Sequence, residues 1–360
     1  MTRVFISDCE GPISKNDNAF ETTSHFVPEG EKLFTVISKY DDALAYVLKR
    51  PNHKAGDTLK LVLPFLKAYD ISDSVMCEFS AHNLILIAGA KETSRYVRKV
   101  APSFIVSTSY EHYIRAVCGA LDFPYKNAYC TKLELDKYDV PKNEQTRLKE
   151  LAREIAQMPM LEVSADKESM HDFSTADQET IRRLDEIFEK EIANMEAGKI
   201  YQEVDPMGGV EKAEAVRDIV RKLGLPLSDV LYVGDSITDA DAFSLVRKGN
   251  GLAASFNGNE FAVKNAEIAV LSENSIVTAV ISDVFIRFGK AQALTTANDW
   301  NRESLAKSPV NRALLDRLFK LYPNELPKVK ITTHENMETL AEESSQFRKR
   351  VRGEAIGRLG

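Results

Sequence analysis

The stretch VLYVGDSITD at residues 230–239 joins a short apolar run to two acidic residues. The run at 230–233 predicts a buried strand that ends at Gly234. Asp235 follows that strand directly, and Asp239 lies one helical turn further along, so both carboxylates can face one pocket. Taken alone, the stretch also fits a helix cap followed by a solvent-facing aspartate. It therefore predicts a strand with an acidic segment at its end. Whether this segment forms a functional site depends on motifs elsewhere in the chain.

A second acidic residue follows an apolar run near the N-terminus. Val4-Phe5-Ile6 precedes Asp8 and the turn Gly11-Pro12, and this short, partly β-branched run predicts another buried strand. A carboxylate at the end of such a strand lies where open α/β sheets place their chemistry. Further short strands are expected at 103–107, 252–256 and 268–271, with helices at 110–121 and 212–223. This alternation of strands and helices predicts an α/β fold.

Helical segments interrupt and extend the α/β pattern. Apolar residues recur at helical spacing from about 29 to 82, and the chain from 132 to about 201 is dense in Lys and Glu with similar spacing. The segment from about 286 to 360 also has a helical pattern. We therefore expect two helix-rich insertions and a helical C-terminal extension around one α/β core.

Composition narrows the class of protein. The chain has 360 residues, which suggests two or three structural units, and 44% of them are hydrophobic, as in ordinary globular proteins. With a net charge of −7, the chain lacks the broad positive field that non-specific nucleic-acid binding needs. Four scattered cysteines without a C-x-x-C argue against a disulfide framework and a thiolate zinc site. Apolar stretches such as 84–90 are far shorter than the ~20 residues that span a bilayer. We expect a cytoplasmic protein that is not membrane-spanning and binds no nucleic acid.

The acidic residues at the two strand ends suggest phosphoryl transfer. Asp8 offers a carboxylate nucleophile that can take a phosphoryl group as an aspartyl-phosphate. Asp8 and Asp235 supply the hard oxygen ligands that Mg²⁺ prefers, and Asp239 can face the same pocket. Glu10 could protonate the leaving oxygen and later activate water.

Polar and basic residues elsewhere can complete such a site. Ser107 and its neighbour Thr108 can bind a phosphate oxygen, and Lys212 supplies positive charge against the phosphate and Asp8. Each is weak evidence alone, because a lysine is most often solvated and a serine most often caps a helix. The basic cluster at 347–352 is expected to be a solvated helix face or a tail, with a docking element for an acidic partner as the alternative. The value of the candidate residues therefore lies in their order along the chain.

This order resembles the haloacid dehalogenase (HAD) superfamily, most of whose members are Mg²⁺-dependent phosphatases. The family's first motif, D-x-D-G-T, is matched by DCEGP at 8–12, and its second, a strand ending in Ser or Thr, by Ser107. Its third, a helix-borne Lys, is matched by Lys212, and its fourth, G-D-x-x-x-D, by the segment 234–239. The stretch 209–274 looks like the C-terminal half of the family core throughout.

The resemblance implies a Rossmann-like three-layer core with a parallel sheet and helical cap insertions. It also implies Mg²⁺ as the cofactor, with Asp8, Glu10, Asp235 and Asp239 as ligands, Glu10 through its backbone carbonyl. Under it the core is expected at 1–19, 84–135 and 206–285. The caps are expected at 20–83 (C1 position) and 136–205 (C2 position), and the C-terminal extension at 286–360.

The first motif departs from the family pattern at two positions. Glu10 stands where the family usually has Asp, and its longer side chain changes the acid–base geometry. Pro12 replaces Thr or Val and fixes the backbone where the following flap begins. The variant D-x-E-G-P is similar to that of a small archaeal group of such proteins, some labelled as subunits of an energy-converting hydrogenase.

Two functions from different classes follow. The first is a Mg²⁺-dependent phosphatase that acts on a small phosphorylated metabolite through an aspartyl-phosphate. The alternative is a catalytically weak or inactive accessory subunit that keeps the fold for binding, with the C-terminal helical extension as the element that docks a protein partner. C–halogen or C–P bond cleavage is a weaker third reading, since dehalogenation needs no metal and no cap lysine for C–P cleavage is identified.

Overall fold

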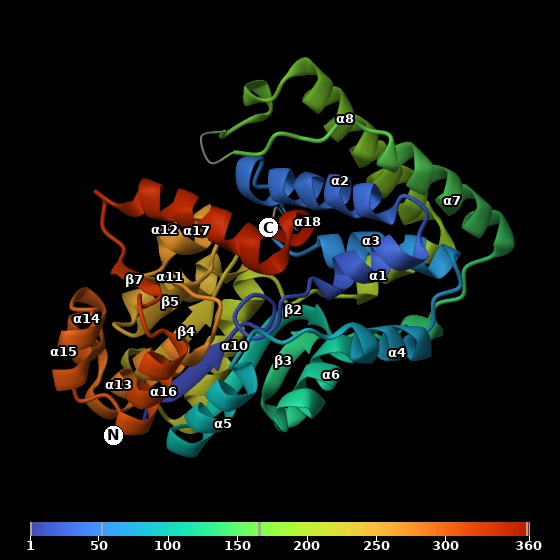
Figure 1. The fold of residues 1–360 in the computed structure, drawn as a ribbon. Helices are drawn as coiled ribbons and strands as arrows, with labels where there is room; N and C mark the ends of the chain where they lie inside the picture. Colours follow the sequence, from blue (N-terminus) through green and yellow to red (C-terminus); the bar gives the residue numbers. More distant parts are fainter. Residues whose placement is uncertain (1, 52, 165–166, 358, 360) are drawn as a thin grey trace.

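The computed structural model describes residues 2–51, 53–164, 167–357 and 359. Within these residues, seven strands form one sheet, drawn in Figure 1. The strands are β1 (Val4–Ser7), β2 (Ser103–Tyr110), β3 (Ala128–Thr131), β4 (Val230–Gly234), β5 (Leu252–Phe256), β6 (Ile268–Leu271) and β7 (Lys328–Ile331). Their order is β3-β2-β1-β4-β5-β6-β7, with β7 antiparallel to β6 and every other pair parallel. The predicted α/β fold with a parallel sheet is confirmed, and so are the five strands expected from the sequence.

Helices cover both faces of the sheet. On one face lie α5 (Ala90–Val100), α6 (Glu111–Leu121) and α13 (Ile276–Phe288), which share an apolar core with Phe5 and Ile105. On the other lie α10 (Gly209–Leu223) and α11 (Ala240–Lys248), which pack against Val4 and Ile6. Strands buried on both faces are continuous apolar runs, which is why Val4 to Ile6 shows no alternation. This arrangement confirms the three-layer core that the family resemblance implied.

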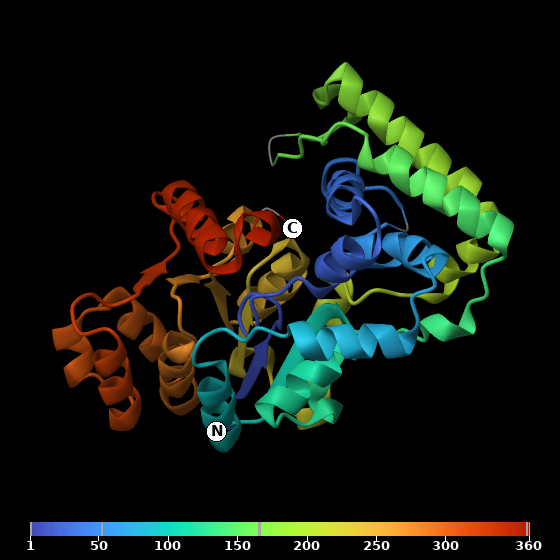
Figure 2. The same cartoon turned by 45° about the vertical axis from the view of Figure 1, so that its right-hand side comes forward.

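A separate helical body lies beside the sheet, in blue and green in Figures 1 and 2. Between β1 and β2 the chain forms α1 (Asn18–Phe26), α2 (Gly30–Asp42), α3 (Thr58–Ala68) and α4 (Asp73–Asn83). Between β3 and β4 it forms α7 (Lys142–Ala156), α8 (Thr175–Asp185) and α9 (Lys199–Glu203). Side chains from both segments share one apolar core, in which Phe65 of α3 meets Phe188, a residue just after α8. Two insertions that are separate in the sequence therefore build a single body.

The C-terminal region is helical, as expected, and also contains a strand. Its helices are α14 (Lys290–Asn298), α15 (Arg302–Lys307), α16 (Arg312–Leu321), α17 (Met337–Arg352) and α18 (Glu354–Gly357). β7 has the sequence KVKI, and Val329 is its buried residue, so an alternating pattern extends the sheet at its edge. The helix α17 packs through Leu340 and Ala341 against β6 and against the short helix α12 (Glu260–Asn265).

Among the helices of the described residues, none has both the length and the apolar character needed to cross a lipid bilayer.

Candidate active site

The acidic residues meet where neighbouring parallel strands end. Asp8 follows β1, Asp235 follows β4, and these two strands lie side by side in the sheet. The backbone N–H of Asp8 donates to the carbonyl of Val233 over 2.8 Å, which extends the pairing up to the two aspartates. Asp8 is 5% exposed and Asp235 1%. Both line a cavity of about 100 Å³ at this edge of the sheet.

Gly11 allows the two acidic loops to approach each other. Its φ of 102° lies in the region that favours glycine. A Cβ atom at this position would lie 2.1 Å from Oδ2 of Asp235, closer than any side chain can come. The glycine of the first motif is therefore required by contact with the aspartate of the fourth.

Lys212 joins the two acidic segments. It lies in the first turns of α10, its side chain is fully buried, and its Nζ contacts Oδ2 of Asp8 at 2.6 Å and Oδ1 of Asp239 at 2.8 Å. Burial alone would lower the pKa of this lysine, but the attraction of the two aspartates outweighs burial and raises it. The lysine is therefore held charged next to Asp8.

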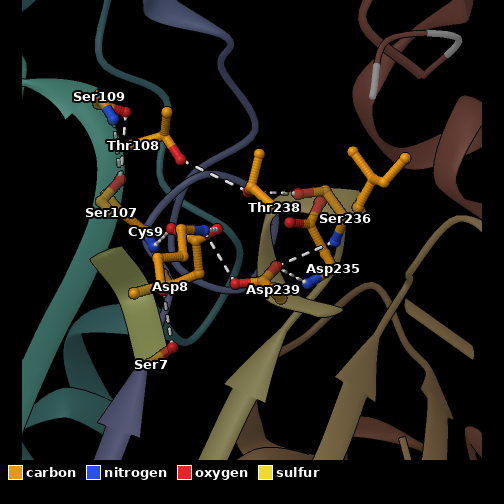
Figure 3. Close-up of polar contacts among 12 residues, drawn as sticks. Ser7, Asp8, Cys9, Ser107, Thr108, Ser109, Asp235, Ser236, Thr238 and Asp239 are labelled. Carbon is orange, nitrogen blue, oxygen red and sulfur yellow. Dashed lines mark hydrogen bonds and ion pairs between the residues drawn. The ribbon is translucent and has the colours of Figure 1, made fainter. Parts of the chain in front are cut away.

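Asp239 is hydrogen-bonded through both of its oxygens. Oδ1 accepts from Lys212 and from the hydroxyl of Tyr232 at 2.7 Å. Oδ2 accepts from the backbone N–H groups of Asp235 at 2.9 Å and Ser236 at 3.0 Å, as Figure 3 shows. A carboxylate with this many donors holds the lysine and the loop at 235–236 in place.

The aspartates together fit a hard divalent cation. Asp8, Asp235 and Asp239 can each offer one oxygen such that these atoms all lie within 4.8 Å of one another. A set made only of carboxylate oxygens suits Mg²⁺. Burial raises the pKa of Asp8 to about 7, although Lys212 opposes the rise. The ionised form of Asp8 would therefore gain from further positive charge close by, which a cation supplies.

Ser107 and Thr108 reach the same cavity from β2, the strand on the other side of β1. The expected strand end at Ser107 is too early, because β2 continues to Tyr110 and pairs there with Thr131 of β3 across a shift in register. Oγ of Ser107 accepts from the N–H of Ser109 at 3.3 Å, and Thr108 donates to the hydroxyl of Thr238 at 3.4 Å. Figure 3 shows Ser107 and Thr108 on the opposite side of Asp8 from Asp235.

Glu10 lines the cavity, and its side chain also binds the first residue of α1, the first helix of the helical body. Its Oε1 accepts from the backbone N–H of Asn18 at 2.7 Å, at the start of α1. Burial and the nearby Asp17 raise the pKa of Glu10 well above its ordinary value. The protonated form that this favours is the form a general acid needs.

Two arginines in the site were not predicted from the sequence. The Nη1 atoms of Arg348 and Arg352, both on α17, contact Oδ2 of Asp235, the second at 3.0 Å. Their side chains are 4% exposed, so the expectation of a solvated helix face is wrong for these two, whereas it holds for Arg350, whose side chain is 63% exposed. The sequence does carry a sign of this, because positions four apart share one face of a helix.

The fold and the site define the class of the protein, a Rossmann-like α/β protein with an acidic cluster at the carboxyl ends of its central strands. The family model for haloacid dehalogenase-like hydrolases matches residues 60–283, and the chain belongs to this family. The match begins after Asp8, so the first motif lies outside the matched residues. The evidence that Asp8 belongs to the site is its contact with Lys212 in the structure.

Solved structures of other proteins are similar to this chain. The structure of gene product AF1437 from Archaeoglobus fulgidus has a TM-score of 0.79 and 26% identity, and the match covers 100% of this chain and 99% of that one. A substrate-bound phosphoserine phosphatase complex has a TM-score of 0.45 and 15% identity over 76% of this chain and 95% of that one. No curated protein matches the sequence.

Proposed function

We propose that the protein is a Mg²⁺-dependent phosphatase that acts on a small phosphorylated metabolite through an aspartyl-phosphate at Asp8. The observation that supports this most strongly is the pairing of Lys212 with Asp8 and Asp239, next to Asp235, at the end of the central strands. These groups provide a nucleophile, a fixed positive charge and oxygen ligands in one buried place. A cavity of about 100 Å³ suits a small substrate.

In the first step, a carboxylate oxygen of Asp8 attacks phosphorus, and the bond from phosphorus to the leaving oxygen breaks. Glu10 gives its proton to that oxygen, so the product leaves as a neutral alcohol. In the second step, Glu10 takes a proton from water, which attacks the phosphorus and releases phosphate from Asp8. Lys212 stabilises the charge on the phosphoryl oxygens, and Ser107 and Thr108 donate to them.

The cation would be held by Asp8 and Asp235 with the backbone carbonyl of Glu10. Mg²⁺ bound there would neutralise charge on the phosphoryl group as it transfers. Asp239 would join them as a ligand, because it can offer an oxygen within 4.8 Å of one from Asp8 and one from Asp235. Its hydrogen bonds would also hold Lys212 and the loop at 235–236 in place.

The helical body is the proposed cap of the enzyme. Its two segments correspond to the insertions at 20–83 and 136–205, and its residues Phe34, Ser38 and Asp42 line the cavity together with Asp8. A cap in this place would exclude water and select the leaving group.

Phosphate release tests the proposed function. The purified protein is given an aryl phosphate and a panel of phosphorylated metabolites, with Mg²⁺ and with a chelator. We expect release that requires Mg²⁺ and that is restored when Mg²⁺ is added back. Equal release with and without the metal, or no release from any substrate, would contradict the proposal.

The role of Glu10 predicts a dependence on the leaving group. Glu10→Gln keeps the shape of the side chain and removes its proton, so kcat/KM for an alkyl phosphate should fall about 10²- to 10⁴-fold. For p-nitrophenyl phosphate, whose leaving group needs no proton, the fall should be less than about tenfold. Glu214→Gln on the exposed face of α10 is the matched control. Equal losses on both substrates would remove Glu10 as the acid.

The alternative of an accessory subunit is not favoured, because Asp8, Glu10, Ser107, Thr108 and Asp235 line one cavity. Lys212 contacts Asp8 directly behind them. Co-purification of the native protein within a stable larger complex, together with no phosphate release, would favour that alternative.

A further inference from the structure

Two positive side chains converge on a single oxygen of the acidic site. Arg348 and Arg352 both bind Oδ2 of Asp235, and both side chains are almost fully buried. Among the described residues, no hydrogen bond to Oδ1 of Asp235 is formed, so this oxygen is the one left for another ligand. The two arginines and Asp235 line the same cavity as Asp8.

Arg352 and the helix α17 that carries both arginines are held at the site by contacts that do not involve Asp235. Arg352 donates through Nε to the carbonyl of Lys15 at 2.9 Å and through Nη2 to that of Asn16. Elsewhere on α17, Ser344 donates to the carbonyl of Gly258 at 2.7 Å. Leu340 and Ala341 pack against α12 and β6. Figures 1 and 2 show α17 and α18 above the sheet, with α18 on the side of the helical body. The guanidinium groups are therefore fixed beside Asp235 by the fold itself.

The direct ion pairs of the site balance in charge. When all three are ionised, Asp8, Asp235 and Asp239 carry three negative charges. Lys212 pairs with the first and the last, and the two arginines pair with Asp235, so three positive charges face them. Without the arginines the same network would have an excess of two negative charges, the charge that one divalent cation neutralises.

We infer that Arg348 and Arg352 set the affinity of the acidic site for divalent cations, and that they lower it. A cation held by Asp235 would be close to both guanidinium groups, because these contact the same carboxylate. Like charges repel strongly in a buried site of low polarisability. This inference rests on the proposed cation site and is independent of whether hydrolysis follows.

Binding of Mn²⁺, measured by electron paramagnetic resonance and calorimetry on the full chain, tests the inference without an activity assay. Arg348→Gln and Arg352→Gln should each bind Mn²⁺ at least about tenfold more tightly than the unaltered protein. Arg350→Gln, on the exposed face of the same helix, should change nothing. Arg348→Lys and Arg352→Lys keep the charge and should stay within about threefold of the unaltered protein.

The outcomes separate the possible failures. Equal or weaker binding by the Gln variants would overturn the inference, since the arginines would then be neutral or would orient Asp235 for the cation. If the Gln variants fail to fold, a tenfold change in the Lys variants would overturn it, because their charge is kept. Absence of Mn²⁺ binding by every protein would overturn both the inference and the proposed cation site. Binding as expected without phosphate release would support the inference and contradict the proposed phosphatase.

Discussion

Asp8→Asn should lower phosphate release by at least about 10⁴-fold, since removal of a covalent nucleophile is among the costliest changes to an enzyme. The amide keeps the size of the side chain, and its oxygen can still accept from the N–H of Cys9, which donates to Asp8 at 2.6 Å. The variant should therefore fold. Its loss of activity would then reflect the chemistry of the carboxylate and not a loss of structure.

The aspartyl-phosphate can also be observed directly. Borohydride reduces an acyl phosphate to the alcohol, so quenched turnover mixtures of the unaltered protein should yield homoserine at position 8 by peptide mass spectrometry. Asp316→Asn is the matched control, because Asp316 is 64% exposed on α16 and pairs only loosely with Arg312. Phosphate release by Asp8→Asn within tenfold of the unaltered protein would show that the nucleophile lies elsewhere.

Lys212→Met should both inactivate and destabilise the protein. The lysine is fully buried, and its removal leaves the carboxylates of Asp8 and Asp239 without their shared counter-charge. Removing one partner of a buried ion pair costs about 3–5 kcal/mol of the free energy of unfolding. Denaturation by urea, followed by circular dichroism at neutral pH, measures this as a lower midpoint.

Lys222→Met provides the comparison for this loss. Lys222 lies on the same helix, is 61% exposed and pairs with Asp218 at the surface. Its substitution should change the free energy of unfolding by less than about 0.5 kcal/mol. Equal midpoints for the two variants would mean that Lys212 contributes nothing beyond an ordinary surface lysine.

Much of the fold could be predicted from the sequence because strands and helices are encoded locally. Val4 to Ile6 and the run at 230–233 are apolar, short and followed by acidic residues, and the structure places them as neighbours in the sheet. Because the two strands are neighbours, Asp8 and Asp235 lie close together at their ends. Lys212 was found through its position at the start of a helix, although nothing local indicates that it is buried.

Other features depend on contacts between distant segments and could not be read from a local pattern. Arg348 lies 113 positions from Asp235 in the chain. The spacing of Arg348 and Arg352 puts them on a helix face apart from Arg350, but nothing local indicates that this face is the buried one. β7 is a strand only because the edge of β6 is available to pair with it. The end of β2 was placed too early for a similar reason, since its last residues are fixed by β3.

The shared apolar core of the two insertions also constrains how the chain is made. Synthesis from the N-terminus completes α1 to α4 before β2 and β3 exist, but their partners α7 to α9 lie after β3, between Lys142 and Glu203. Until then, large side chains such as Phe65 lack the ring of Phe188 that covers them. Nascent chains that end between these segments should therefore expose apolar surface on the ribosome, bind chaperones and be cut readily by proteases.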